Sequence, residues 1–213
     1  MYARVTTFES SPANTDEAIR YVDETVRPAT LASGALDLDL LLDRQTGKGY
    51  VIAWWKDAAT THATEAFASQ LREQSRQALG LTIVDVHTYE VTVEEDMNGP
   101  RAAAARVTPA QGDASRVDEL TQWTTSQLLP TYRAQPGFSA WRTLSDRQSG
   151  RSLIISYWET AAAMQSAETL LAQSRARGTQ ELSVTFDPTE RYEITRVMPP
   201  QPGQTQRTQP SAE

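Results

Sequence analysis

The chain contains two similar stretches about 103 residues apart, and this internal repeat limits the possible folds more than any single motif does. The thirteen residues from Asp43 to Trp55, DRQTGKGYVIAWW, recur from Asp146 to Trp158 as DRQSGRSLIISYW, with six positions identical. Two copies are too few for a solenoid, whose units need about three neighbours to bury their faces. The repeat therefore predicts two compact domains in one chain, residues 1–95 and 103–197, with a linker at 96–102 and a disordered tail at 198–213.

Each copy is predicted to fold in the order β-α-β-β-α-β. In the first copy the elements are a strand at 2–8, a helix with Asn14 as its N-cap that Pro28 and Gly34 close, a hairpin of strands at 36–43 and 50–55, a helix from Asp57 to about Leu79, and a strand at 82–93. In the second copy they are a strand from 104, a helix capped by Ser115, strands at 138–146 and 152–158, a helix at about 161–177, and a strand from 182. This order gives a four-stranded antiparallel sheet with two helices on one face.

The strand from Tyr50 to Trp55 is apolar on both faces. An antiparallel sheet with one face in water alternates apolar and polar residues, so this sheet needs a cover on the face opposite its helices. The other copy is the nearest available cover. The fold class predicted is therefore α+β, with the two repeats pairing their sheets inside one molecule as an intramolecular pseudo-dimer. Further homodimerisation through the outer surfaces is left open.

Tryptophan ends the third strand in both copies, and an Ala-rich helix follows: Trp55-Lys56-Asp57 and Trp158-Glu159-Thr160. With the element order, this signature resembles the dimeric α+β barrel proteins of the antibiotic biosynthesis monooxygenase (ABM) family over about 2–94 and 103–197. The resemblance implies two ferredoxin-like repeats forming an intramolecular barrel. It also implies a cofactor-independent monooxygenase acting on an aromatic or polyketide-like substrate. The alternative is a non-catalytic pseudo-dimeric barrel that binds a ligand or serves as a structural module.

The family's functional residues are replaced in this chain. Where the quinone-forming members carry Asn and Tyr, the two copies have Val51 and Thr61, then Ile154 and Met164. Where haem-degrading relatives carry Trp and the axial His, they have Thr64 and Gln74, then Ala167 and Arg177. The expected cofactor is therefore none.

His62 is the candidate catalytic residue, because it follows the strand-end Trp55 on a helix and an unperturbed imidazole titrates near neutral pH. The alternative is a polar residue on the surface. The only other histidine is His87. Two histidines without a third ligand at metal spacing predict no metal site.

Flat aromatic side chains predict a pocket for a small hydrophobic or aromatic molecule. The candidate pocket residues are Trp54, Trp55, Tyr157, Trp158 and Trp141, together with Asp39 and its repeat equivalent Arg142. Core packing explains the aromatic residues equally well. Asp39 and Arg142 are expected either to form a salt bridge between the copies or to line one asymmetric pocket, and exposed strand residues of opposite sign remain the alternative.

The net charge is −7, and the 20 basic residues are scattered along the chain. They form no basic stripe of the kind that indicates nucleic-acid binding, so we expect no nucleic-acid partner. No apolar run approaches the roughly 18 residues of a membrane span, and no signal peptide is visible, so we expect no membrane partner and a cytoplasmic location. The chain has no cysteine, which excludes disulfides, thiolate nucleophiles and Cys-type zinc sites.

Overall fold

The computed structural model describes residues 1–97 and 102–196. We call these two segments the first half and the second half. The predicted tail at 198–213 lies outside the described residues, as does most of the predicted linker.

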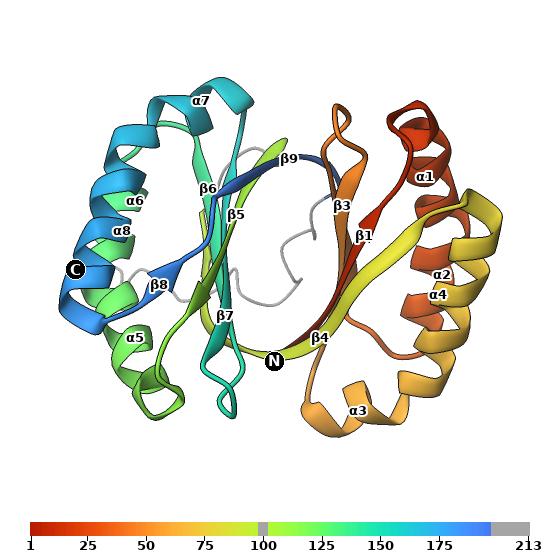
Figure 1. Ribbon diagram of the computed structural model, residues 1–213, viewed down its shortest axis with the longest axis horizontal. Coiled ribbons are helices and arrows are strands. Elements are labelled where there is room, and N and C mark those ends of the chain that lie inside the picture. The colour runs from red at the N-terminus through yellow and green to blue at the C-terminus, as the bar shows by residue number, and fades with distance from the viewer. Residues whose placement is uncertain (98–101, 197–213) are drawn as a thin grey trace, which may run out of the picture.

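The halves present their elements in closely matching order (Figure 1). The first half contains β1 (Tyr2–Glu9), the 3-10 turn η1 (Pro12–Asn14), α1 (Thr15–Tyr21), the π-helical turn η2 (Val22–Val26), α2 (Arg27–Ala32), β2 (Asp37–Leu42), β3 (Lys48–Trp55), α3 (Ala58–Ala63), α4 (Glu65–Leu79) and β4 (Thr82–Asp96). The second half contains β5 (Ala104–Gln111), η3 (Ala114–Arg116), α5 (Val117–Trp123), η4 (Thr124–Leu128), α6 (Leu129–Arg133), β6 (Phe138–Ser145), β7 (Arg151–Trp158), α7 (Ala161–Ser166), α8 (Glu168–Leu182), β8 (Thr185–Phe186) and β9 (Glu190–Arg196).

Eight antiparallel strands close into a barrel in the order β7-β6-β4-β1-β3-β2-β9-β5, because β5 pairs back onto β7. Two seams join the halves. The first part of β4 pairs with β1 and its last part with β6, where Glu90 lies opposite Ser145. At the other seam β9 pairs with both β5 and β2, and Leu41 lies opposite Ile194. The predicted mixed α+β class is confirmed, with eight strands in one closed antiparallel barrel.

The barrel has a filled interior and a helical layer outside each half. Residues of both halves share one inner hydrophobic cluster, which includes Val5, Ile52, Val107, Leu144 and Ile155. The alternating side chains point outward and pack under the helices in two separate clusters, one for each half, and Val93 from the last part of β4 joins the cluster of the second half. Both faces of β3 are therefore covered, as its sequence predicts.

The predicted helix boundaries need correction. Pro28 does not end the first helix but lies inside α2, directly after the π-helical turn η2. Proline has no N–H to donate to the carbonyl four residues earlier, and a π turn is a common way for a helix to absorb such a defect. The long second helix is likewise interrupted at Thr64, which separates α3 from α4.

The predicted caps also differ. Asn14 makes no capping bond through its side chain, whereas Ser11 accepts a hydrogen bond from the Ala13 N–H. In the second half the carboxylate of Asp113 caps the turn by accepting from the Ser115 N–H. Both caps begin a 3-10 turn that precedes the α-helix, so the N-terminal signal in the sequence lay two or three residues further upstream.

The two β-hairpins that the repeat marks have the same local structure. Gly47 donates its N–H to Asp43 O at 2.8 Å, and Gly150 does the same to Asp146 O at 2.9 Å. Both glycines have positive φ, near +75°, where a side chain is strained. A Cβ atom on Gly47 would lie 2.0 Å from Ser10 O, so the chain also approaches too closely for any other residue.

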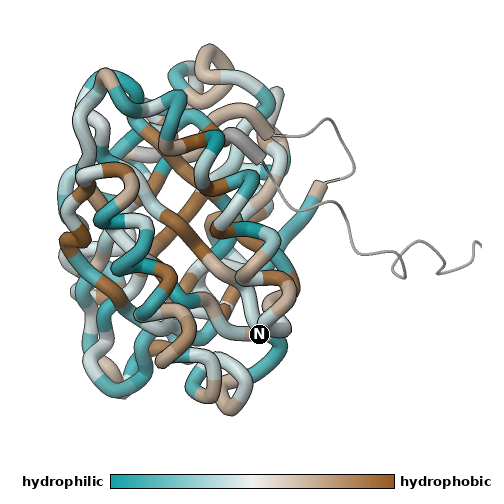
Figure 2. The backbone as a smooth tube through the Cα atoms, turned by 90° about the vertical axis from the view of Figure 1, so that its right-hand side faces the viewer, coloured by the Kyte–Doolittle hydropathy of each residue, from teal (hydrophilic) through white to brown (hydrophobic). Residues whose placement is uncertain are grey.

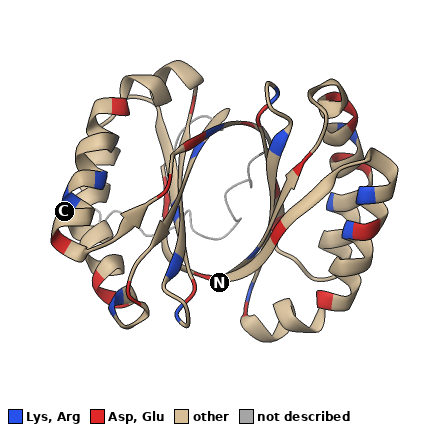
Figure 3. Ribbon diagram, in the orientation of Figure 1, with Lys and Arg blue, Asp and Glu red and all other residues tan. Residues whose placement is uncertain are grey.

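Acidic and basic side chains are interspersed on both helical layers (Figure 3). In the described part of the chain, no helix is both long and apolar enough to cross a bilayer.

Candidate functional site

Each half has a cavity between the outer face of its strands and its helices. The larger, cavity 1, has a volume of about 70 Å³ and lies in the first half under α1, α2 and α4. Figure 2 looks onto this helical layer, with hydrophobic strand segments visible between the helices. Most of the lining is apolar and comes from both layers, including Phe8, Val22, Val51, Trp55, Leu71 and Ile83.

Cavity 2 occupies the equivalent place in the second half and has a volume of about 40 Å³. Its lining is more polar and more aromatic, and includes Arg106, Trp123, Tyr132, Trp141, Ser156 and Arg175. The two cavities therefore lie at the same place in two similar layers but differ in size and chemistry.

Larger side chains in the second half explain the difference in volume. Tyr132 stands where the first half has Thr30, and Trp141 stands where it has Leu38. The rings of Tyr132 and Trp141 pack edge to face with their centroids 4.7 Å apart. Since both rings line cavity 2, they fill space that stays open in cavity 1.

Arg4 forms the polar end of cavity 1. It is only 3% exposed, on the helix-facing side of β1. Its guanidinium donates to Thr61 O, lies 2.8 Å from Glu65 Oε2, and stands 5.4 Å from the centre of the Trp55 ring. Burial lowers the pKa of Arg4, while the Glu65 carboxylate acts in the opposite direction. Glu65 also pairs with Arg72, which lines the same cavity.

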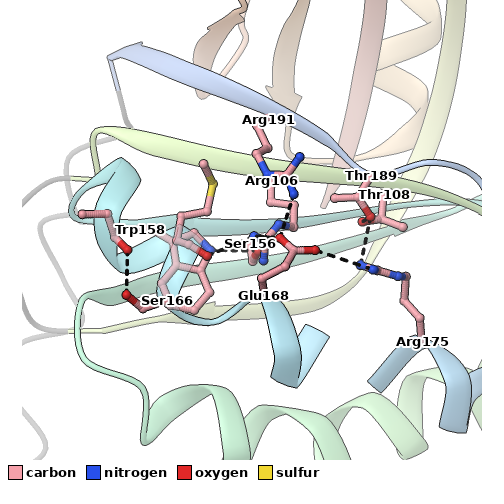
Figure 4. A network of polar contacts seen from close by, with 11 residues as sticks. Arg106, Thr108, Ser156, Trp158, Ser166, Glu168, Arg175, Thr189 and Arg191 are labelled. Atoms are coloured by element: carbon pink, nitrogen blue, oxygen red, sulfur yellow. Dashed lines mark hydrogen bonds and ion pairs between the residues drawn. The ribbon is translucent and has the colours of Figure 1, made fainter. Parts of the chain in front are cut away.

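The second half repeats this network with one more arginine (Figure 4). Arg106 Nη2 donates to Met164 O at 3.0 Å and to Glu168 Oε2 at 2.8 Å. Glu168 also binds Arg191 at 2.7 Å and approaches Arg175 at 3.8 Å. Burial is the main cause that lowers the pKa of Arg106, which is 1% exposed.

Sequence reasoning missed these arginines. Arg4 and Arg106 occur in the matching segments ARVT at 3–6 and 105–108. An arginine at the same place in the two matching strands, between apolar neighbours, was the available signal. Its partner glutamates lie about 60 residues further along the chain, at equivalent positions in the two copies.

The predicted pocket residues separate into two groups. Trp55 lines cavity 1 and Trp141 lines cavity 2, while Trp158 is fully buried in the helical layer of the second half. Trp54 and Tyr157 belong to the inner barrel cluster and line neither cavity.

Asp39 lies on the inward side of β2, where Trp54 Nε1 donates to its Oδ2 at 3.0 Å and the Tyr157 hydroxyl at 3.4 Å. Burial raises the pKa of Asp39 to about 6. The salt bridge considered between Asp39 and Arg142 is not formed, because Arg142 pairs instead with Asp96 at 2.7 Å. Both residues are buried, so the alternative of exposed strand positions is wrong.

His62 lies on the exposed side of α3 and lines neither cavity. Its neighbour Thr61 takes the buried position instead. Among the described residues that line cavity 1, the titratable side chains are Arg4 and Arg72, neither of which is a general base at neutral pH. In the described segments, no three His, Asp or Glu side chains converge as a metal ion would require.

Two proteins of Mycobacterium tuberculosis are similar in sequence to this chain. The uncharacterized protein Rv2557 is 29% identical over 167 residues, which cover 78% of this chain and 74% of Rv2557. The uncharacterized protein Rv2558 is 22% identical over 185 residues, covering 85% of this chain and 78% of Rv2558. No protein-family model matches the chain.

Solved structures with the same fold have low sequence identity. An anthrone oxidase-like protein aligns with a TM-score of 0.63 at 12% identity over 92% of both chains. A proposed monooxygenase from Lactobacillus acidophilus aligns with a TM-score of 0.61 at 10% identity, over 91% of this chain and 92% of its own. A ferredoxin-fold protein related to antibiotic biosynthesis monooxygenases, from Listeria monocytogenes, aligns with a TM-score of 0.50 at 9% identity, over 92% and 95%. This chain therefore shares the α+β fold of these three structures.

Proposed function

We propose that this protein binds a small, mostly apolar molecule in cavity 1. The observation that carries the proposal is the contrast between the two halves. The same layer holds a mostly apolar cavity of about 70 Å³ in the first half, whereas Tyr132 and Trp141 narrow it to a more polar one of about 40 Å³ in the second. Since protein interiors are normally close-packed, an apolar cavity in only one of two similar layers points to a use for it.

The lining indicates an aromatic ring with an oxygen substituent. A cavity needs about 10–15 Å³ to hold one water molecule, so 70 Å³ accommodates about five to seven non-hydrogen atoms. Trp55 supplies a flat wall, and Phe67, which is 40% exposed, stands at the mouth. Among the described residues, the hydroxyls of Thr6 and Thr30 make no hydrogen bond, so either one is available to a ligand oxygen.

Oxygenation of that molecule is the second candidate function. Structural neighbours described as monooxygenases and as anthrone oxidase-like support it. The cavity supplies no general base, so the substrate must itself be acidic enough to ionise, and the positive charge of Arg4 would stabilise the resulting oxyanion. In the overall reaction a methylene carbon loses two hydrogens and gains one oxygen atom from O₂, and the second oxygen atom leaves with those hydrogens as water. A catalytic role for His62 stays a prediction, and His62 does not line this cavity.

Binding is tested with phenol, whose seven non-hydrogen atoms match the cavity, by calorimetric titration of the full chain. Thr30→Tyr and Ala18→Leu introduce the residues that the second half carries at these positions, and each should abolish saturable binding. Thr125→Tyr is the matched control, because Thr125 is exposed and lines neither cavity. Unchanged phenol affinity in both cavity-filling variants would refute the proposal.

Oxygenation is tested by oxygen uptake with 1,3-cyclopentanedione, whose seven non-hydrogen atoms match cavity 1 and whose acidic methylene carbon would become a carbonyl. We expect uptake above the uncatalysed rate in the unmodified protein and none in Thr30→Tyr. Saturable phenol binding without oxygen uptake would support the non-catalytic alternative, a barrel that only binds its ligand.

We also propose that the halves are tandem copies of one domain, residues 1–95 and 103–197. The matched Arg4, Glu65 and Arg72 of one half and Arg106, Glu168 and Arg175 of the other support this. An experimental structure in which the helices and strands of the two halves fail to superpose would contradict it.

A further inference from the structure

Arg106 is a buried charge whose hydrogen-bonding capacity is only partly used. Its Nη2 donates to Met164 O and to the Glu168 carboxylate. Its Nε and Nη1 have no hydrogen-bond partner among the described residues. An unpartnered N–H of a buried cation is costly, and Arg106 is 1% exposed and lines cavity 2.

The charges around this cavity do not balance. Three arginines, Arg106, Arg175 and Arg191, surround the single carboxylate of Glu168 (Figure 4). The equivalent network in the first half has two arginines for Glu65. Glu181 accepts from Trp123 Nε1 at 2.6 Å and pairs with Arg177, so its charge is already matched. Cavity 2 therefore lies in a positive field that a bound anion would neutralise.

Two further polar side chains of cavity 2, Ser156 and Tyr132, can also donate. Ser156 Oγ accepts from Trp158 Nε1 at 3.0 Å, which leaves its own proton for another acceptor. Burial raises the pKa of Tyr132 to about 12, so its phenol keeps its proton at neutral pH. The first half has Ala53 and Thr30 at these two positions, so it lacks the Ser156 hydroxyl and has a shorter hydroxyl side chain in place of Tyr132.

We propose that cavity 2 binds a small carboxylate of the size of formate or acetate, with Arg106 as its buried counter-ion. The volume of about 40 Å³ accommodates three to four non-hydrogen atoms, and sulfate or phosphate has five. This site is separate from cavity 1 and does not depend on the function proposed there.

The test is calorimetric titration of the full chain with sodium formate, at an ionic strength held constant with sodium chloride. We expect saturable binding that is at least tenfold weaker in Arg106→Gln and in Ser174→Leu. Ser174→Leu fills cavity 2 with the residue that the first half carries there, Leu71. Ser166→Leu is the matched control, since Ser166 is exposed on α7, outside the cavity, and should leave formate affinity unchanged.

Ser174→Leu keeps the test decisive if Arg106→Gln does not fold. Absence of saturable formate binding would overturn the proposal, because only water would then occupy the cavity. An unchanged affinity in Ser174→Leu would also overturn it, because formate would then bind outside the cavity. Equal saturation by chloride alone would overturn the assignment to a carboxylate.

Discussion

The carboxyl group of Asp39 gives the barrel a measurable dependence on pH. Asp39 is 3% exposed, and burial raises its pKa from the ordinary 3.8 to about 6. Because the folded pKa lies above the unfolded one, the folded chain holds this proton more tightly. The contribution of Asp39 to stability is therefore greatest below about pH 4 and is lost as the pH rises through 6.

At 1.36 kcal/mol per pKa unit, the full loss is about 3 kcal/mol. About 2 kcal/mol of it falls between pH 4.5 and pH 7, according to the two titration curves. Asp39→Asn removes the titration but keeps an oxygen that accepts from Trp54 Nε1 and from the Tyr157 hydroxyl. We therefore expect the unfolding free energy of Asp39→Asn, relative to the unmodified protein, to rise by about 2 kcal/mol over this interval.

Urea unfolding followed by tryptophan fluorescence at pH 4.5, 5.5, 6.2 and 7 measures this difference. Asp113→Asn serves as a control that should show almost no pH dependence over this range, because hydrogen bonds from Ser115 lower the pKa of the exposed Asp113 carboxyl, so that it titrates below pH 4.5 in both states. A difference for Asp39→Asn that stays constant across these pH values would refute the assignment of a desolvated carboxyl inside the barrel.

Three further substitutions test the packing and the turns by urea unfolding. Leu144→Ala, in the inner cluster at 0% exposure, should lower the unfolding free energy by about 2–5 kcal/mol, whereas Val84→Ala at 54% exposure should change it by less than about 0.5 kcal/mol; equal losses would contradict the inner cluster. Gly47→Ala should destabilise more than Gly80→Ala, since both have positive φ but only Gly47 has a backbone atom in the way; the reverse order would disprove the hairpin geometry. Asp57→Ala should cost about 1 kcal/mol, because the Asp57 carboxylate caps α3 by accepting from the Thr60 N–H, and no loss would show that the cap is not made.

The order of elements was predictable from sequence because the repeat supplied two independent versions of each pattern. The apolar residues on both faces of Tyr50 to Trp55 correctly indicated a sheet covered on both sides. The helix interruptions were not predictable from sequence. The π turn before Pro28 and the break at Thr64 depend on how each helix packs against its sheet.

The site was only partly predictable. Trp55 lines cavity 1, whereas Trp54 lies inside the barrel, and alternation along β3 alone could not tell which face borders a cavity and which fills the barrel. His62 was chosen for its chemistry, yet on a helix adjacent residues point about 100° apart, and Thr61 holds the inward position. The buried arginines were not predicted, because their burial depends on pairing with Glu65 and Glu168, which are distant in sequence.

The most direct test of an open, ligand-binding cavity 1 is a crystal structure of the full chain soaked with 4-bromophenol, with the bromine located by its anomalous scattering. Because 4-bromophenol has eight non-hydrogen atoms, one more than cavity 1 accommodates, the structure predicts its ring against Trp55 and a bromine peak at the mouth beside Phe67, with none in the corresponding layer of the second half. Bromine found in the second half, or only on the molecular surface, would contradict it.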